Sequence, residues 1–414
     1  MSRRRLFRAA GIIDAHRSCA PGAILVDRNV VVAAGSPESI GRIDDVDMID
    51  ESSSILLPAL VNAHAHLDLS HLPPEPYSGD FTTWIGSIRA RRLTEPEAIR
   101  RTVEHGAGLA RAGGTGIIGD IAGIGSLAPL EGLRSAGLAG VGFVEVFGLG
   151  AASAEAAIRR FDEAAARWGS EGDVRLGCQP HAPYSCGVDV YAAAAGRGLP
   201  VSSHVAETLE ELRLIERGDG PLADMLDGFG ISDRPGRARH PVTLLGEPLA
   251  AAPWLLAHLN YVDDESIAAL AQAGATIAYC PRASAYFGHP HGGHPGHAYR
   301  AMLEAGLRVA LGTDGLPCLD THDRISVLDE MRLLFARDGA EPERLMAMAT
   351  TNGAAALGFS PGLVTLDPGP TLGVLAVDLE PSAPREDPVR DPGAALLGGT
   401  GGPRWVVGPV SGAE

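Results

Sequence analysis

The chain has 414 residues, of which 45% are hydrophobic and 21% charged, as in a soluble globular protein with one large and one small domain or two to three average ones. Its formal net charge of −17 would be repelled by nucleic-acid phosphates and anionic membranes, so we expect neither as a partner. The five cysteines are scattered without a CxxC motif and no apolar run approaches the ~20 residues of a membrane span, so we expect a cytoplasmic protein without a disulfide framework.

The first 57 residues form short runs that alternate apolar and polar residues and break at Gly, Pro and Ser, as β-strands do. From residue 58 to residue 357, apolar strand-like runs alternate with helical stretches rich in Ala, Arg and Glu. Short strand-like runs return over residues 358–414. We therefore expect the two chain ends, 1–57 plus 358–414, to form one small β-sandwich domain, and residues 58–357 to form a larger domain.

The larger domain is predicted to be a (β/α)8 TIM-like barrel in the α/β class, because eight strand-like runs alternate with helices. An open doubly wound sheet is the alternative. It is disfavoured because no GxGxxG follows a first strand and because polar groups recur at many strand ends rather than at one switch point. The expected strands are 59–66, 115–120, 139–147, 174–180, 200–205, 254–259, 275–280 and 308–313.

Histidines and an aspartate at the ends of these strands predict a metal site. His64 and His66 are two residues apart, so both point to the same side of the first strand. His204 and His258 end two later strands and Asp314 follows the eighth, and the carboxyl ends of barrel strands meet on one face. Each residue alone is more typical of ordinary structure, so the prediction depends on their joint placement. Imidazoles with a carboxylate suit Zn²⁺ and leave a position for water, although Fe²⁺ or Mn²⁺ would also fit; the predicted ligands are His64, His66, His204 and Asp314.

Two further features have alternative interpretations. Glu207 lies three residues after His204, where a carboxyl group beside the metal would move a proton to a substrate. The alternative for Glu207 is a first-turn glutamate that suits the helix dipole. The segment FGHPHGGHPGH carries four histidines and is interpreted as a surface loop, with a substrate lid or a second metal-binding patch as alternatives.

The motifs resemble those of the amidohydrolase superfamily, in its nucleobase and nucleoside deaminase branch. The similarity extends from GAILVDRNVVVAAG through NAHAHLDLS to ATTNGAAALGFSPGLVTLDPG. SSHVAET resembles the HxxE motif of strand five in that branch, and HAPYS resembles its strand-four motif, whose histidine, here His181, contacts the substrate. No lysine at the strand-four end is available to bridge two metals, which favours a single ion.

A narrower resemblance is to the aminodeoxyfutalosine deaminases of menaquinone biosynthesis. These carry an acidic residue and a serine after the paired histidines, then a Gly-x-Phe-x-x-Trp segment and an arginine. NAHAHLDLS followed by SGDFTTWIGSIRARR matches this order, with Asp68, Ser70, Gly79, Phe81 and Trp84.

The resemblance implies hydrolytic deamination of an amino-purine nucleoside with release of ammonia. Asp314 would take a proton from the attacking water, His258 would stabilise the developing charge, and Glu207 would protonate the ring nitrogen. His181 would touch the ring or the ribose. Trp84 and Phe287 would enclose the base, and Arg282 and Arg89 would reach the benzoate group of aminodeoxyfutalosine.

Several alternatives stay open at this point. Other substrates are S-adenosylhomocysteine, methylthioadenosine, adenosine and guanine, and other reactions of the same site are hydrolytic dechlorination and amide cleavage. An inactive scaffold is a remote alternative, since a scaffold does not need all six metal and catalytic side chains. The expected partner is a small purine-type molecule, and a homodimer is the default expectation for a soluble enzyme.

Overall fold

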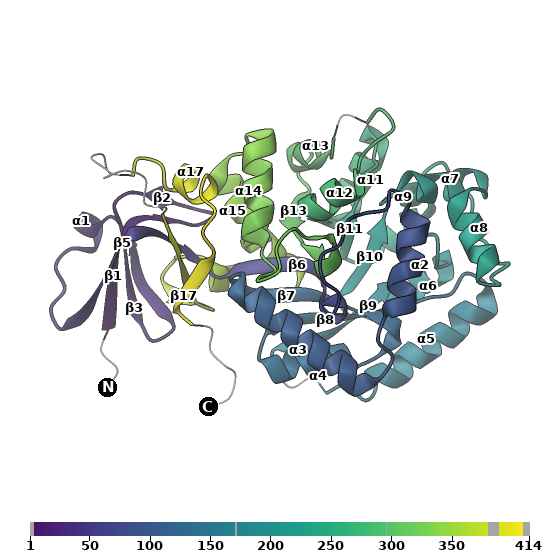
Figure 1. Cartoon of the computed structure of the whole chain (residues 1–414), viewed down its shortest axis with the longest axis horizontal. Coiled ribbons are helices and arrows are strands. Elements are labelled where there is room, and N and C mark those ends of the chain that lie inside the picture. The colour runs from purple at the N-terminus through teal and green to yellow at the C-terminus, as the bar shows by residue number, and fades with distance from the viewer. Residues whose placement is uncertain (1–3, 170–171, 295, 380–388, 409–414) are drawn as a thin grey trace. The chain divides into compact units, whose positions relative to one another are not determined.

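The computed structural model describes residues 4–169, 172–294, 296–379 and 389–408 (Figure 1). The chain separates into two compact units. The first contains Met1–Ala63, Gly108–Ile118 and Asp323–Glu414, and the second contains His64–Ala107 and Gly119–His322. Within the described ranges, no helix combines the length and the apolar character needed to cross a bilayer.

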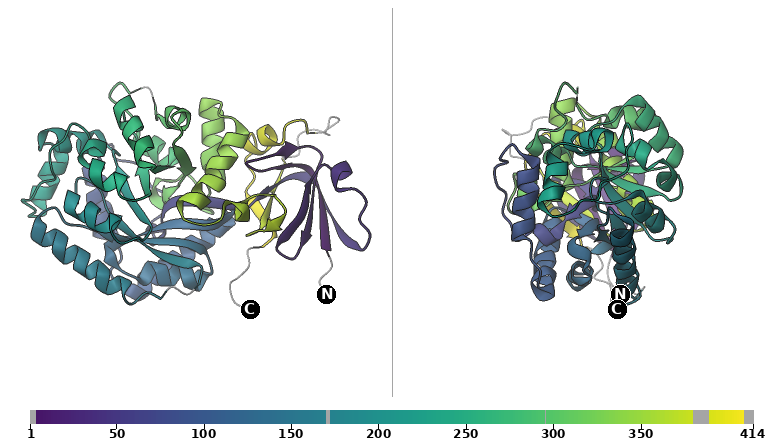
Figure 2. Two further views of the ribbon diagram at one scale, coloured as in Figure 1. Left: turned by 180° about the vertical axis from the view of Figure 1, so that it is seen from behind. Right: turned by 90° about the vertical axis from the view of Figure 1, so that its right-hand side faces the viewer.

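A curled sheet of nine strands forms the barrel, in the order β13-β12-β11-β10-β9-β8-β7-β6-β14. The pairings from β8 through β13 and that of β14 with β6 are parallel, and helices lie around the sheet (Figure 2). The strands are β6 (Leu60–His66), β7 (Thr115–Ala122), β8 (Ala139–Val146), β9 (Val174–Pro180), β10 (Val201–Val205), β11 (Trp254–His258), β12 (Thr276–Tyr279), β13 (Arg308–Leu311) and β14 (Asp314–Gly315).

The predicted eighth strand is interrupted, and its middle residues link the two edges of the sheet. The Gly312 N–H donates to the Tyr279 carbonyl at 2.8 Å, and the Thr313 N–H donates to the His64 carbonyl at 2.9 Å. Asp314 then pairs with β6 at Ala65. The predicted TIM-like α/β barrel is confirmed.

The barrel strands are buried along almost their whole length, as expected for parallel strands covered by helices. Every residue of β7, β10 and β11 is buried. The helices that follow the strands are α3 (Pro96–Ala112), α4 (Ala128–Ala136), α5 (Ala151–Ala165), α6 (Val188–Ala195), α7 (Leu209–Arg217), α8 (Pro221–Gly228), α9 (Pro241–Leu244), α10 (Gly246–Ala250), α11 (Asp264–Ala273), α12 (Pro281–Phe287), α13 (Tyr299–Glu304), α14 (Val327–Asp338), α15 (Pro342–Ala349) and α16 (Thr351–Ala356).

Two helices begin at side-chain caps close to the predicted site. The Asp80 carboxylate accepts a hydrogen bond from the Thr83 N–H at 2.6 Å and starts α2 (Phe81–Arg91). The Thr208 hydroxyl accepts from the Glu211 N–H at 3.1 Å and starts α7. Such caps satisfy N–H groups that the first helical turn leaves unpaired. The short turn from β10 into α7 therefore has a defined conformation.

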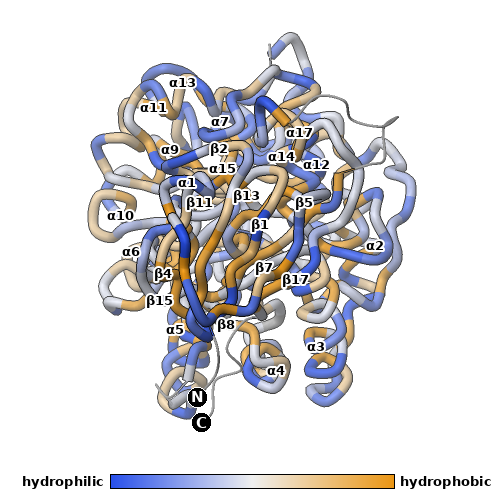
Figure 3. The backbone as a smooth tube through the Cα atoms, turned by 90° about the vertical axis from the view of Figure 1, so that its left-hand side faces the viewer, coloured by the Kyte–Doolittle hydropathy of each residue, from blue (hydrophilic) through white to orange (hydrophobic). Residues whose placement is uncertain are grey.

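The second sheet joins the two ends of the chain, as predicted. Its order is β15-β4-β3-β1-β5-β16-β17, with β2 paired to β1. Figure 3 shows hydrophobic and hydrophilic stretches along the strands of this sheet. A buried cluster includes Phe7, Ile24 and Leu56 from the N-terminal part and Val374 from the C-terminal part. The strands are β1 (Arg4–Ile13), β2 (Ser18–Cys19), β3 (Gly22–Asp27), β4 (Val30–Gly35), β5 (Val46–Pro58), β15 (Gly369–Pro370), β16 (Val374–Asp378) and β17 (Pro403–Val407), with the helices α1 (Pro37–Ile40) and α17 (Pro392–Leu397).

The predicted fold class also included a separate β domain formed by both chain ends, and this part of the prediction is confirmed as well. The predicted domain boundaries at 57/58 and 357/358 stay a prediction, because a compact unit and a folding domain need not have the same limits.

Candidate active site

Strand β6 presents two imidazoles at its carboxyl end. His64 and His66 project to the same side, with ring centroids 5.1 Å apart. The backbone of His64 is held by the Thr313 N–H, which fixes β6 against the returning eighth strand. All the residues of this site belong to the second compact unit.

Strands β10 and β11 add two more histidines at their carboxyl ends. His204 Nε2 lies 3.3 Å from His66 Nε2, and the His258 ring centroid lies 5.4 Å from that of His64. His204 Nδ1 donates to the His181 carbonyl at 2.8 Å. This bond places the ring proton on Nδ1, so Nε2 presents a lone pair to the cluster.

Asp314 completes the cluster from β14. Its Oδ1 lies 3.6 Å from His66 Nε2 and accepts the Gly315 N–H at 2.8 Å. Asp314 has φ 62° and His258 has φ 72°, so both adopt the left-handed region that side chains other than glycine rarely occupy. Non-glycine residues in this region tend to cluster at functional sites, where the surrounding structure maintains the strain.

The donor set fits a divalent metal ion. Ligand atoms of His64, His66 and Asp314 lie within 4.8 Å of one another, as do those of His64, His204 and His258. Tetrahedral zinc with Zn–N distances of ~2.05 Å places two ligand nitrogens roughly 3.3–3.4 Å apart, close to the separation between His66 and His204. Burial holds the pKa of each histidine below its usual range, to about 4 for His204, so the imidazoles are neutral lone-pair donors.

Glu207 lies beside this cluster in the turn after β10. Its Oε1 is 3.5 Å from His258 Nε2. Burial, then the nearby Asp314 and Glu211 carboxyls, raise the pKa of Glu207 well above its usual value, which favours the protonated form of this carboxyl. The Glu211 carboxylate accepts the N–H groups of Ala206 and Glu207 at 2.9 and 3.0 Å, which fixes the turn that carries the acid.

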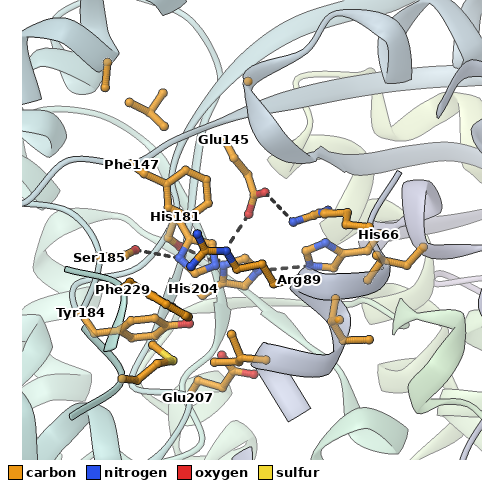
Figure 4. Close-up of a pocket in the computed structure, with 18 of the residues that line it drawn as sticks. His66, Arg89, Glu145, Phe147, His181, Tyr184, Ser185, His204, Glu207 and Phe229 are labelled. Atoms are coloured by element: carbon orange, nitrogen blue, oxygen red, sulfur yellow. Dashed lines mark hydrogen bonds and ion pairs between the residues drawn. The ribbon is translucent and has the colours of Figure 1, made fainter. Parts of the chain in front are cut away.

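A second charged group lies next to the histidines. Arg92 Nε donates to Asp68 Oδ2 at 2.8 Å, and its Nη1 lies 3.4 Å from Glu145 Oε2. Glu145 Oε1 lies 3.8 Å from His181 Nε2, while His181 Nδ1 lies 2.7 Å from Ser185 Oγ (Figure 4). Burial and then the Arg92 charge lower the pKa of His181 to about 3, so this imidazole is neutral and can both donate and accept a hydrogen bond.

A cavity of about 700 Å³ opens over both groups. This volume is in the range of small-molecule sites, roughly 300–1,000 Å³. Figure 4 shows imidazoles, carboxyls and aromatic rings pointing into it. Its polar lining includes His66, His181, His204, His258, Glu145, Glu207, Asp314 and Arg92, and its apolar lining includes Leu69, Phe81, Trp84, Phe147, Phe161, Met225, Phe229 and Ile231.

The family model described as "Amidohydrolase family" matches residues 55–395 of this chain. The chain belongs to the amidohydrolase family. It is 30% identical over 359 residues to an aminodeoxyfutalosine deaminase of Deinococcus radiodurans, covering 82% of each chain. It is 28% identical over 363 residues to a 5-methylthioadenosine/S-adenosylhomocysteine deaminase of Pyrococcus furiosus, covering 82% of this chain and 80% of the relative.

A solved structure supports the fold of this amidohydrolase. The zinc-bound adenosine deaminase of Xanthomonas campestris superposes with a TM-score of 0.72 at 19% identity, covering 98% of this chain and 92% of the other. The prediction of an amidohydrolase enzyme is therefore confirmed, and the deaminase relatives support the hydrolytic deaminase class. Members of the family typically bind a divalent metal, which agrees with the donor set described above.

The structure brings together all the predicted metal and catalytic residues of this amidohydrolase. The six residues fall into overlapping groups of close ligand atoms at the carboxyl ends of the strands. They are the predicted metal ligands His64, His66, His204 and Asp314 and the predicted catalytic residues Glu207, His258 and Asp314. Their individual roles stay predictions. Three predicted substrate residues, His181, Trp84 and Arg89, line the cavity above them.

The other two predicted substrate residues do not line this cavity. The Arg282 guanidinium is buried and binds Asp320 Oδ1 at 2.9 Å and Thr321 Oγ1 at 3.2 Å. Phe287 lies behind Trp84, with ring centroids 4.9 Å apart, in an aromatic cluster with Phe81. The resemblance implied a substrate role for both residues, but α12 directs both side chains away from the cavity that holds the histidines.

Three residues of the site were not identified from the sequence. Glu145 and Arg92 line the cavity, and Glu211 holds the turn at Glu207. Glu145 is the only acid in the apolar run GVGFVEVFG, and a lone carboxyl near the end of a buried strand is a usable signal, because such burial requires a partner. Arg92 and Glu211 lie in helical or loop segments with many other charged residues, so the sequence alone does not distinguish them from ordinary surface residues.

The histidine-rich segment has a structural role in two places. His289 is buried, and its Nδ1 lies 2.8 Å from the Tyr261 hydroxyl. His297 Nε2 donates to the His258 carbonyl at 2.7 Å, which supports the end of β11. Among the described histidines of this segment, no group meets the geometry of a metal cluster.

Proposed function

We propose that this amidohydrolase is a zinc-dependent deaminase of an amino-purine nucleoside, with aminodeoxyfutalosine as the preferred substrate. The observation that carries the proposal is the buried carboxyl group of Glu207, which lies 3.5 Å from His258 and is grouped with Asp314, in a cavity that adjoins four imidazoles. The Deinococcus radiodurans relative supports the substrate.

His64, His66, His204 and Asp314 would hold the ion. When bound, a divalent ion supplies a Lewis acid that makes a water molecule acidic near neutral pH. Asp314 would accept a proton from the attacking water, a role that suits a carboxyl whose pKa burial raises to about 6. His258 orients the attacking oxygen by a hydrogen bond.

Glu207 holds the proton that the purine needs. Attack at the amine-bearing carbon places negative charge on the adjacent ring nitrogen, and Glu207 donates its proton there. Asp314 passes the proton that it took from the water to the amine, the carbon–nitrogen bond breaks and ammonia leaves. The proton of the remaining hydroxyl group goes to Glu207, which leaves a carbonyl group on the ring. The neutral His181 lies where it can hydrogen-bond the nucleoside, with Glu145 behind it.

Methylthioadenosine or S-adenosylhomocysteine is the second candidate substrate, favoured by the Pyrococcus furiosus relative. We also propose that the enzyme is cytoplasmic and acts in menaquinone biosynthesis. It would work as a homodimer on a small purine-type substrate. The proposed reaction involves neither a nucleic acid nor a membrane.

Ammonia release from a panel of amino-purine nucleosides tests the proposal, with zinc content measured on the same protein. We expect release from aminodeoxyfutalosine at a higher kcat/KM than from methylthioadenosine, S-adenosylhomocysteine or adenosine. Absence of release from every nucleoside by zinc-loaded protein would contradict the deaminase assignment.

A further inference from the structure

The turn that carries Glu207 runs beside the end of strand β11 and is bonded to it at three successive carbonyl groups. The first two bonds are between backbone groups, from the Leu259 N–H to the Val205 carbonyl at 3.0 Å and from the Tyr261 N–H to the Ala206 carbonyl at 3.2 Å. The third carbonyl, that of Glu207 itself, accepts a bond from a side chain, because Asn260 Nδ2 donates to it at 3.0 Å. The turn is therefore held in register with the end of β11.

Both ends of the Asn260 amide are bonded inside the protein. Its Nδ2 donates to the Glu207 carbonyl, and its Oδ1 accepts the Ser284 hydroxyl at 2.9 Å. A carbonyl oxygen can only accept, so the amide must direct its NH2 group to Glu207 and its oxygen to Ser284. Ser284 lies in α12, directly after β12. One hydrogen-bonded path thus joins the ends of the neighbouring strands β10, β11 and β12.

The backbone of Glu207 is fixed on both sides. Its N–H donates to Glu211 Oε2 at 3.0 Å, and its carbonyl accepts the Asn260 amide. Asn260, Glu211 and Ser284 are 3%, 0% and 2% exposed, so bulk water does not compete for these bonds. None of these three side chains lines the active-site cavity, so any effect on a reaction must act through Glu207.

The same path connects the acid to His258. Glu207 Oε1 lies 3.5 Å from His258 Nε2, and Asn260 follows His258 by two residues. Ala206 has φ 50° and His258 has φ 72°, so both segments bend through the left-handed region. Such conformations persist where the surrounding structure maintains them, and the Asn260 amide supplies one bond between the two bends.

We propose that Asn260, oriented by Ser284, is a positioning residue for the proton donor Glu207. It fixes the peptide carbonyl of Glu207 and so holds the carboxyl group beside His258, at the place from which a proton passes to the substrate. The inference rests on the proposed function, in which Glu207 is the acid. A misplacement of about 1 Å can cost ~100-fold in rate, so this bond is expected to affect turnover.

Asn260→Leu tests the bond, because the variant keeps a branched side chain that cannot donate to the Glu207 carbonyl. We expect kcat for ammonia release to fall by roughly 10- to 100-fold, with KM changed by less than about threefold. Zinc content should be unchanged, since Asn260 is not among the predicted ligands. Ser284→Ala removes only the donor that orients the amide, so its kcat should fall by a smaller factor, roughly 3- to 10-fold.

A double-mutant cycle distinguishes positioning from a general loss of stability. The acid is absent in the Glu207→Gln background, so Asn260→Leu should lower the residual kcat there by less than about twofold. A loss of stability would lower kcat by the same factor in both backgrounds. Equal factors in the two backgrounds, or a wild-type kcat in Asn260→Leu itself, would overturn the proposal.

Asn29→Leu and Ser266→Ala are the matched controls. Asn29 Nδ2 donates to the Gly408 carbonyl at 2.8 Å in the other compact unit. Ser266 is buried, and its hydroxyl donates to Asp263 Oδ1 at 2.7 Å at the start of α11. Each variant loses a bond of the matching kind outside the site, so each should keep the wild-type kcat and KM.

Crystal structures of the zinc-loaded wild type and Asn260→Leu separate this inference from the proposed function. If the wild type releases ammonia from no nucleoside, the deaminase proposal fails, yet the position of the Glu207 carboxyl can still be compared. Displacement of this carboxyl from His258 in Asn260→Leu would support the positioning role, and an unchanged distance would overturn it. If Asn260→Leu does not fold, the same comparisons are made on Ser284→Ala.

Discussion

Two buried carboxyl groups of the site differ in proton affinity because their neighbours differ. Burial raises the pKa of both Asp314 and Glu207, to about 6 for Asp314. Asp314 is partly stabilised as an anion by the Gly315 N–H, and its charge then raises the pKa of Glu207 further. Such a separation assigns the base role to one group and the acid role to the other.

The first prediction concerns the acid. Glu207→Gln removes the transferable proton but keeps the size and polarity of the side chain, so kcat should fall by ~100-fold or more while metal content is unchanged. Ammonia release and elemental analysis on the same preparation measure the two effects. Glu216→Gln, on the exposed side of α7, is the control and should behave as wild type. Full activity of Glu207→Gln would refute the acid role.

The second prediction concerns His66, whose Nε2 lies 3.3 Å from His204 Nε2 and 3.6 Å from Asp314 Oδ1. His66→Ala should lose metal and activity together, because the remaining donors no longer surround one point. His105→Ala, on the exposed face of α3, should retain both. Metal bound at wild-type stoichiometry in His66→Ala would show that His66 is not a ligand.

At the scale of elements, helix α2 connects a surface cap to the substrate cavity. Asp80 starts the helix, and Trp84 and Arg89 from successive turns line the cavity. The helix buries only Phe81 and Ile88 fully, so packing fixes it less than it fixes the barrel strands. The cap therefore contributes to how well the outer cavity is ordered.

The third prediction follows from this cap. Asp80→Ala should lower the free energy of unfolding by about 1 kcal/mol and raise KM more than it lowers kcat, because the catalytic groups lie on other elements. Asp80→Asn retains a side-chain oxygen for the Thr83 N–H and should recover most of both effects. Denaturant titration and steady-state kinetics measure them. A fall in kcat without a change in KM would contradict the proposal that the Asp80 cap affects substrate binding more than the chemical step.

The barrel strands were predictable to within one or two residues, because each is a continuous apolar run bounded by polar or glycine residues. The convergence of His66, His204 and His258 followed from their place at strand ends. The directions in which the side chains of Arg282 and Phe287 point could not be predicted, because a residue in a helix after a strand can face either side. The ion pair of Arg282 with Asp320 also joins residues 38 positions apart.

At the scale of the whole molecule, the site concentrates groups that are costly to bury without an ion. Several neutral imidazoles and carboxyls with raised pKa lie within a few ångströms of one another inside the barrel. The unfolded chain does not hold these groups together. Binding of an ion to the folded chain alone therefore adds directly to the free energy of unfolding.

The fourth prediction is that chelation destabilises the protein. An ion present at 100 times its dissociation constant adds ~2.7 kcal/mol to the folded state, so its removal should lower Tm by a few degrees. Zinc should restore Tm in the wild type, whereas His66→Ala should start at the lower Tm and respond to neither treatment. Calorimetry with and without chelator measures the shift. If elemental analysis shows that the wild type has lost its ion and Tm stays constant, the ion does not occupy this buried cluster, because a ligand bound at such a site must stabilise the fold that creates it.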